Sequence, residues 1–230
     1  MKVLMVLTSN DKLGEHDEQT GWYLPECAHP YHVFKQAGTV EMVSASPAGG
    51  KAPVDESSVD ASKEDKVSMD LYKDEAFKTF TEETKKLSDV KGDKFDAVFV
   101  VGGFGTMWDL PENADLQEII RNTYEQGGIV SAVCHGPCAL TQVKLSDGNF
   151  LVKDKKVTAF TDDEERAVER IDKIPFTNEQ KLMEVGAVYT KRAAWSAHVV
   201  VDGRLITGQN PASATGVANA ILARSSGTVY

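Results

Sequence analysis

Short apolar runs recur along the chain at intervals that suit the strands of a buried parallel sheet. Each run is five or six residues long, which is typical of a strand covered on both faces. The runs are KVLMVL (2–7), VEMVS (40–44), DAVFVV (96–101) and GIVSAV (128–133). Segments of helical length separate them, and strands that alternate with helices predict an α/β fold with a doubly wound, mostly parallel sheet and helices on both faces.

Two of the intervening segments carry a clear helical pattern. Residues 21–38 and 112–128 each place apolar side chains on roughly one face and run into a glycine, which is a common helix stop. Pro25 and Pro30 are awkward inside a helix, because proline lacks a backbone N–H. We therefore expect the first of these helices to start late or to bend.

The region between residues 47 and 94 departs from this alternation. It is polar and rich in Lys, Asp and Glu, with one helix expected near residues 69–87. We expect a single domain over residues 1–230 that carries a polar insertion or cap at 47–94. Whether this region covers a pocket stays open.

The last third of the chain predicts short strands, a hairpin and two helices. Asp202-Gly203 is a strong turn signal between two β-rich runs, and it predicts a hairpin over residues 198–207. The other elements are expected as strands at 155–160 and 187–190 and as helices at 177–186 and 211–223.

Composition and charge remove several classes of protein. The 25 Lys and Arg against 35 Asp and Glu give a net charge of −10, and no basic cluster is present, so neither nucleic acid nor an anionic membrane is an expected partner. No apolar run reaches the roughly 18 residues of a membrane span, and the first eleven residues are typical of a buried strand rather than a signal peptide. Three cysteines, Cys27, Cys134 and Cys138, do not make a disulfide framework, which favours a reducing, cytoplasmic location.

The stretch SAVCHGPCAL (131–140) follows an apolar run directly and is the strongest candidate for chemistry. Ala132, Cys134 and Gly136 form a cysteine version of the nucleophile elbow, in which small residues flank a sharp strand-to-helix turn. The N-terminus of the following helix would favour the Cys134 thiolate. The backbone N–H of His135 and the loop at Gly102-Gly103 would form an oxyanion hole. The alternative is that Cys134 is a small buried residue in an ordinary turn.

Several motifs together resemble one known family. The stretches VVGGFGTMWDL, VSAVCHGPCAL, TAFTDDEE and LITGQNPASA are similar to the ThiJ/PfpI superfamily, and GWYLPECAHPYHVF points to its glyoxalase III and heat-shock-chaperone-like branch. The resemblance implies a flavodoxin-like fold, no cofactor and a homodimer. It also implies that Cys134 is the nucleophile, His135 its neighbouring acid/base, and Glu26 a carboxylic acid against the sulfur.

The same resemblance implies that Glu165 completes a Cys-His-Glu triad, although a slip of one residue would put Glu164 there instead. Glu26 must be protonated to be useful beside a thiolate, because two anions would repel each other. Adjacent residues on a sharp turn point apart, so we expect His135 to act on the substrate and not to take the proton from Cys134 directly.

Simpler interpretations exist for most of these residues. Glu164 and Glu165 follow Thr161 as acids in a first helical turn would, and Thr161 with Glu164 makes a capping box. Glu26, His29 and His32 have the spacing of metal ligands, but two prolines interrupt the segment and no second cluster matches, so no metal is expected. Cys138 is expected to pack in the core, because one helical turn is poor geometry for a disulfide with Cys134.

The resemblance implies a glyoxalase III-type lyase of the D-lactate dehydratase class, acting without glutathione. The Cys134 thiolate would form a hemithioacetal with a small 2-oxoaldehyde such as methylglyoxal, and His135 would move a proton between C1 and C2 to give a 2-hydroxy acid, D-lactate. Two alternatives stay open. One is an oxidative-stress redox sensor or holdase chaperone with an oxidisable cysteine. The other is a cysteine peptidase, amidase or deglycase.

Overall fold

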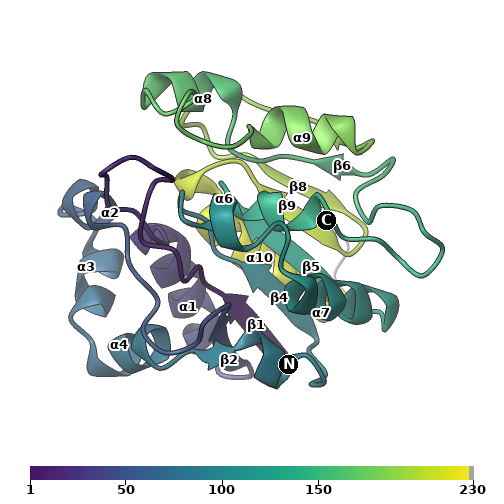
Figure 1. The fold of residues 1–230 in the computed structure, drawn as a ribbon. Coiled ribbons are helices and arrows are strands. Elements are labelled where there is room, and N and C mark those ends of the chain that lie inside the picture. The colour runs from purple at the N-terminus through teal and green to yellow at the C-terminus, as the bar shows by residue number, and fades with distance from the viewer. Residues whose placement is uncertain (228–230) are drawn as a thin grey trace.

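A seven-stranded sheet lies at the centre of the computed structural model, which describes residues 1–227 (Figure 1). Its strand order is β3-β2-β1-β4-β5-β9-β8, and every neighbouring pair is parallel except β8 and β9. The strands are β1 (Lys2–Val6), β2 (Glu41–Ser46), β3 (Lys85–Lys86), β4 (Ala97–Val100), β5 (Ile129–Val133), β8 (Val199–Asp202) and β9 (Leu205–Gly208). The predicted flavodoxin-like α/β class is therefore confirmed.

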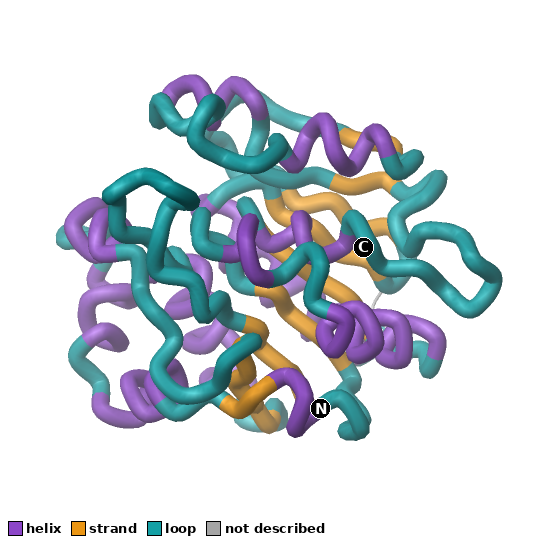
Figure 2. Tube along the Cα trace, in the orientation of Figure 1, coloured by secondary structure: helices purple, strands orange, loops and turns teal. Residues whose placement is uncertain are grey.

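The two faces of the sheet bury two separate sets of apolar side chains. Along β1, Leu4 and Val6 face one cluster while Val3 and Met5 face the other, because successive side chains of a strand point to opposite faces. Helices lie in front of and behind the strands (Figure 2). One face packs against α5 (Leu87–Val90), α6 (Thr106–Asp109), α7 (Ala114–Glu125) and the 3₁₀ segment η1 (Gly136–Leu140), and the other against α1 (Leu24–Ala37) and α10 (Ala214–Ser225).

Helix α1 starts late, as its prolines predict. Pro25 occupies the first turn, where a missing N–H costs nothing, and Pro30 lies inside the helix. The helix ends at Gly38, whose φ of 68° lies in the left-handed region that glycine adopts readily. Its buried face carries Glu26, whose carboxyl lies close to Gly102, just after the end of β4.

The polar region 47–94 contains more helix than its pattern predicts. In place of one helix near 69–87, it forms α2 (Glu56–Ala61), α3 (Lys66–Tyr72), α4 (Glu75–Glu82) and the short α5. Asp55, Asp65 and Asp74 each cap one of these helices with a side-chain oxygen. Phe77 of α4 packs edge-on against Tyr31 of α1, with ring centroids 5.1 Å apart. The region thus lies beside α1 at the β2–β3 edge of the sheet (Figure 1).

A smaller layer lies beside β8 and β9, at the top of Figure 1. It consists of the parallel pair β6 (Lys156–Val157) and β7 (Val188–Tyr189) with α8 (Asp162–Ala167) and α9 (Asn178–Glu184). The predicted hairpin is confirmed as β8 and β9, and the last helix begins with the 3₁₀ turn η2 (Pro211–Ser213) before α10. None of the helices within residues 1–227 is both long and apolar enough to cross a membrane.

Candidate active site

The turn after β5 holds Cys134 in an uncommon backbone conformation. Its φ of 58° lies in the left-handed region, which a residue other than glycine adopts only at a cost of about 1–3 kcal/mol. Hydrogen bonds fix the turn on both sides, from Cys134 N–H to the Gly208 carbonyl (2.9 Å) and from Phe160 N–H to the Cys134 carbonyl (2.8 Å). A Cβ at Gly136 would come within 2.6 Å of the Val100 carbonyl, so only glycine fits there. The sharp, strained turn predicted for this stretch is present.

Cys134, His135 and Glu165 form one continuous chain of contacts. The Cys134 Sγ lies 3.3 Å from His135 Nδ1, and His135 Nε2 lies 2.7 Å from Glu165 Oε1. All three side chains are buried. The expectation that His135 points away from the sulfur is therefore wrong: at the φ of this turn, the imidazole folds back onto the sulfur of the preceding residue. His135 can accept the thiol proton on Nδ1 while its Nε2–H donates to Glu165.

The two adjacent glutamates of α8 have different surroundings. Glu165 contacts His135, whereas Glu164 accepts hydrogen bonds from the N–H and hydroxyl of Thr161 (both 3.0 Å) and completes the predicted capping box. Both side chains are fully buried. Of the two positions that the sequence left open, only Glu165 reaches His135.

Glu26 is fully buried and lies against the turn that carries the sulfur. Burial raises the pKa of its carboxyl to about 8, and the Cys134 side chain and the Gly102 backbone oppose this shift only in part. Neither carboxyl oxygen has a hydrogen-bond partner of good geometry among residues 1–227. A charged carboxylate in that position would be costly, so the neutral acid expected from the sequence is the form that this environment favours at pH 7.

Two glycines at the end of β4 make this close approach possible. A Cβ at Gly102 would come within 2.2 Å of Glu26 Oε2 and 3.0 Å of Cys134 Cβ. Gly103, with φ of 107°, would place a Cβ 2.3 Å from the Gly21 carbonyl. Among the described residues, the backbone N–H groups of Gly103 and His135 donate to no protein acceptor. The two turns thus converge as expected and leave donors for a developing oxyanion.

Burial also changes the ionisation expected of the sulfur. It raises the pKa of the Cys134 thiol, and the nearby carboxyls of Glu164 and Glu165 add to the effect. The helix expected after the turn is only the five-residue 3₁₀ segment η1, so helix-dipole stabilisation of a thiolate is small. In this environment Cys134 is a thiol at pH 7.

Aromatic rings enclose His135, a feature that the sequence motifs did not reveal. The ring of Phe104 lies 4.1 Å from the imidazole centroid and that of Phe160 lies 4.6 Å away. Trp195 meets Phe160 edge-on at 5.8 Å, and the guanidinium of Arg170 lies 4.8 Å above Phe104. Phe104 lies directly after Gly103, and Phe160 lies five residues before Glu165, each inside a motif quoted above. Their closeness in sequence to candidate site residues was the only indication that they belong to the site.

The other candidate residues lie away from this chemistry. Cys138 is buried in the core and its thiol donates to the Thr106 carbonyl at 3.4 Å, which confirms the packing interpretation. His29 Nε2 lies 2.7 Å from Asp65 Oδ2, at the start of α3. Within residues 1–227, no group of three His, Cys, Asp or Glu side chains is arranged to hold a metal ion. Cys27 is buried in the apolar core beneath α1.

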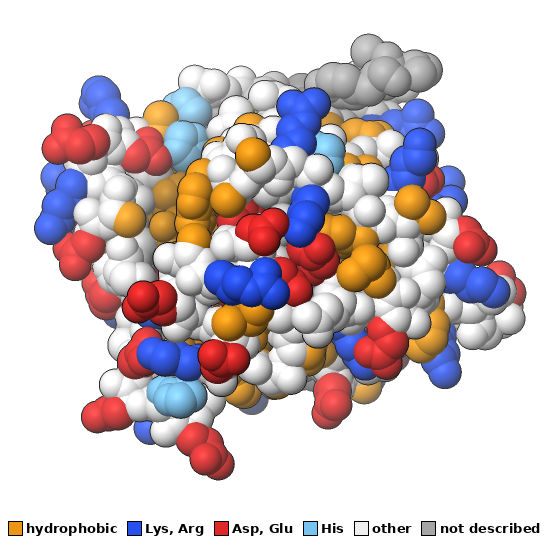
Figure 3. All heavy atoms as spheres, turned by 90° about the horizontal axis from the view of Figure 1, so that it is seen from above, with side chains coloured by type: hydrophobic (Ala, Val, Ile, Leu, Met, Phe, Trp, Pro, Cys, Tyr) orange, Lys and Arg blue, Asp and Glu red, His pale blue; other side chains and the backbone are white. Residues whose placement is uncertain are grey.

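Two cavities occur elsewhere in the fold. One, of about 1010 Å³, lies at the amino ends of the strands beside Met1, Asp96 and Ile129. The other, of about 350 Å³, lies between Trp22 and the helices of region 47–94. Acidic and basic side chains are interspersed on the face that α8 and α9 cover, so this face offers no extended basic surface (Figure 3).

Comparison with known proteins places the chain in a family. The DJ-1/PfpI family matches residues 21–224. Glyoxalase 3 of Candida albicans is 36% identical over 97% of this chain and 98% of its own length, and glutathione-independent glyoxalase HSP31 of Saccharomyces cerevisiae is 36% identical over 93% of each.

Solved structures agree with this assignment. Rapid Encystment Protein 24 KDa of Francisella tularensis superposes with a TM-score of 0.91 at 38% identity over 96% of both chains. The crystal structure of glyoxalase III from Candida albicans superposes with a TM-score of 0.87 at 36% identity, over 97% of this chain and 96% of its own. The chain belongs to the DJ-1/PfpI family, with the glyoxalase III relatives among those it most resembles, as its motifs predict.

Proposed function

We propose that the chain is a glutathione-independent glyoxalase that converts methylglyoxal and similar small 2-oxoaldehydes to 2-hydroxy acids, with D-lactate as the product from methylglyoxal. The contact chain from Cys134 through His135 to Glu165 carries the proposal, because it places a sulfur nucleophile and a proton carrier on the same small substrate. Relatives named as glutathione-independent glyoxalases support the same reaction class.

The first step is addition of Cys134 to the aldehyde carbon, C1. His135 takes the S–H proton on Nδ1 as the S–C1 bond forms, and it returns that proton to the oxygen of the former carbonyl to give a hemithioacetal. Because Nε2 is hydrogen-bonded to Glu165, the free nitrogen of the neutral imidazole is the one that faces the sulfur. The enzyme's own thiol therefore takes the place of glutathione.

The second step moves hydrogen from C1 to C2. His135, neutral again, removes the proton from C1 to form an enediolate, while the C1 hydroxyl proton passes to the oxygen on C2. Return of the proton from His135 to C2 leaves a thioester of the 2-hydroxy acid on Cys134. Glu165 stabilises the imidazolium that exists between these two transfers, since the pair is fully buried.

Two further groups support the charge that develops on oxygen and sulfur. The N–H groups of Gly103 and His135 donate to no protein acceptor among residues 1–227, and they belong to the two turns that meet at Cys134, so they can donate to an oxyanion. The neutral carboxyl of Glu26 can donate a hydrogen bond to the Cys134 sulfur when the sulfur becomes anionic. Water then hydrolyses the thioester, which releases the hydroxy acid and regenerates the thiol.

Burial of the sulfur makes a cysteine peptidase and a redox sensor less suitable. Cys134 is 3% exposed, so an extended peptide cannot reach it without a large opening. A redox sensor needs an accessible thiol of low pKa, whereas burial raises the pKa here. We further expect a homodimer in the cytoplasm, from the family resemblance and from the three unpaired cysteines.

The test is formation of D-lactate from methylglyoxal by purified protein with no glutathione added. Wild type and Cys138→Ala should form D-lactate, and Cys134→Ala should not, although both variants remove a buried thiol. Wild-type turnover in Cys134→Ala, or D-lactate only at the rate without protein, would contradict the proposal.

A further inference from the structure

An aromatic wall continues outward from His135, beyond the groups that move protons. Phe160 is 3% exposed and covers the imidazole, whereas Trp195, in edge contact with Phe160, is 51% exposed. The wall thus runs from the buried imidazole to the solvent. An apolar surface of this kind beside a reactive sulfur suits the part of a substrate that does not react.

The backbone at Trp195 adopts an unfavourable conformation. Its φ of 65° lies in the left-handed region, which is rare for a bulky residue and tends to occur at functional sites. Cys134 shares this feature, and both residues contact Phe160: the Cys134 carbonyl accepts a hydrogen bond from Phe160 N–H, and the indole of Trp195 meets the Phe160 ring. Such a conformation persists only where the surroundings hold it in place.

Glu164 supplies a large part of that restraint. Its Oε1 accepts hydrogen bonds from Trp195 N–H (2.9 Å), Gln209 Nε2 (3.2 Å) and Asn210 Nδ2 (2.8 Å). Its Oε2 accepts from Thr161, and the carboxyl is fully buried. One carboxyl therefore ties the start of α8 to the Trp195 segment and to the turn after β9.

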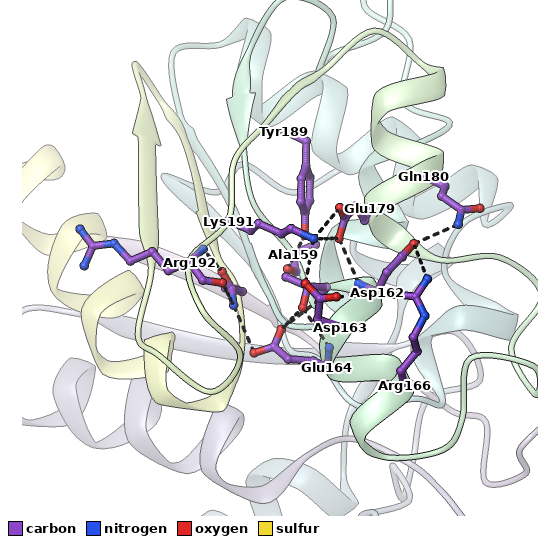
Figure 4. Close-up of polar contacts among 12 residues, drawn as sticks. Ala159, Asp162, Asp163, Glu164, Arg166, Glu179, Gln180, Tyr189, Lys191 and Arg192 are labelled. Carbon is purple, nitrogen blue, oxygen red and sulfur yellow. Dashed lines mark hydrogen bonds and ion pairs between the residues drawn. The ribbon is translucent and has the colours of Figure 1, made fainter.

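Other contacts hold the same segment on either side of Trp195. Lys191 points to α8 and α9, where its Nζ lies 3.0 Å from Asp163 and from Glu179 (Figure 4). Asn210 Nδ2 also donates to the Ser196 carbonyl at 2.8 Å. The segment is fixed at three points, so the indole is presented in one place and not left as a free surface side chain.

We propose that Trp195 lines the entrance to the Cys134 site and selects 2-oxoaldehydes with larger apolar substituents, and that Glu164 is the positioning residue that holds it there. This inference rests on the proposed function. Methylglyoxal is too small to reach from the sulfur to the outer ring, whereas a branched aliphatic substituent extends along the wall. The selectivity between the two substrates therefore depends on Trp195.

The experiment compares kcat/KM for an isobutyl-substituted 2-oxoaldehyde with that for methylglyoxal. Trp195→Ala should lower this ratio about 10-fold, the size expected for losing apolar contact to a few methylene groups, and Trp195→Phe should retain most of it. Met183→Ala removes another large side chain that is 49% exposed, and it should leave the ratio unchanged. An unchanged ratio in Trp195→Ala would overturn the proposal for Trp195.

The role of Glu164 is tested by a double-mutant cycle on the same ratio. Glu164→Gln should lower the ratio in wild type but should have no further effect in Trp195→Ala, because it acts through the indole. If Glu164→Gln does not fold, Asn210→Ala takes its place in the cycle. It removes one of the donors to Glu164 Oε1 and should shift the ratio in the same direction. Equal effects of Glu164→Gln with and without Trp195 would overturn the positioning role.

The outcomes separate this inference from the proposed function. If wild type turns over neither aldehyde, the proposed glyoxalase activity fails, and the inference fails with it. If wild type turns over both and the Trp195→Ala ratio stays at the wild-type value, only the selectivity role fails.

Discussion

The neutral carboxyl of Glu26 predicts an unusual dependence of stability on pH. Its pKa is raised from an ordinary value of 4.5 to about 8 because the side chain is buried. Between these two pH values the unfolded chain has released the proton of Glu26, while the folded chain still holds it. Raising the pH through this window therefore lowers the free energy of unfolding, and above about pH 8 no further loss arises from this group.

The size of the effect follows from the two pKa values. Complete titration corresponds to about 5 kcal/mol, and the interval from pH 5 to pH 8 contains about 3.5 kcal/mol of it. The carboxyl of Asp109, whose pKa burial raises to about 6, contributes a smaller loss in the same direction. A comparison with Glu26→Gln removes that contribution, because Asp109 is the same in both proteins.

Urea denaturation followed by far-UV circular dichroism, at a series of pH values from 5 to 8, measures this difference. The free energy of unfolding of wild type should fall relative to that of Glu26→Gln by about 3.5 kcal/mol across the series. A difference between the two proteins that stays constant from pH 5 to pH 8 would refute the assignment of a neutral, buried Glu26.

Three further predictions concern the groups around the sulfur. Glu165→Gln should lower kcat for methylglyoxal by about 10²–10⁴-fold with a small change in KM, because the imidazolium loses its buried counter-charge; a kcat close to wild type would rule out that role. Gly102→Ala should lower the free energy of unfolding by about 1–3 kcal/mol, since its Cβ would lie 2.2 Å from Glu26 Oε2. Gly92→Ala, whose Cβ would meet nothing within 4 Å, should leave that free energy unchanged. Equal thermal midpoints for the two variants would contradict this prediction. The value of kcat/KM should fall as the pH rises above about 8, where Glu26 ionises, and Glu26→Gln should not show this fall. Rates of D-lactate formation by the two proteins, measured at a series of pH values, would detect the difference.

The parts of the fold that could be predicted are those with a strong local signal. The strands around β1, β4 and β5 are continuous apolar runs, and Asp202-Gly203 identifies the hairpin by its turn chemistry alone. The region 47–94 was harder, because its helices are short and each depends on an aspartate cap and on packing against α1 rather than on a long amphipathic repeat. Propensity alone does not resolve helices of six to eight residues.

For the site, the sharp turn at Cys134 could be predicted from the sequence, but the direction of His135 and the burial of the sulfur could not. The small residues around it indicate a tight turn, but the direction of His135 depends on one backbone angle that only the folded chain reveals. The aromatic enclosure by Phe104 and Phe160 comes from segments distant in sequence. Burial, which raises the pKa of the Cys134 thiol, is likewise a property of the whole fold.

The central claim is that His135 carries a proton from C1 to C2 of an aldehyde held on Cys134. Conversion of methylglyoxal in deuterium oxide tests it most directly, because a proton held on an imidazole can exchange with solvent. The account predicts that the D-lactate formed carries deuterium at C2, measured by proton NMR. Complete retention of the aldehyde hydrogen at C2, with no deuterium detected, is the result expected of a direct hydride shift and would contradict the account.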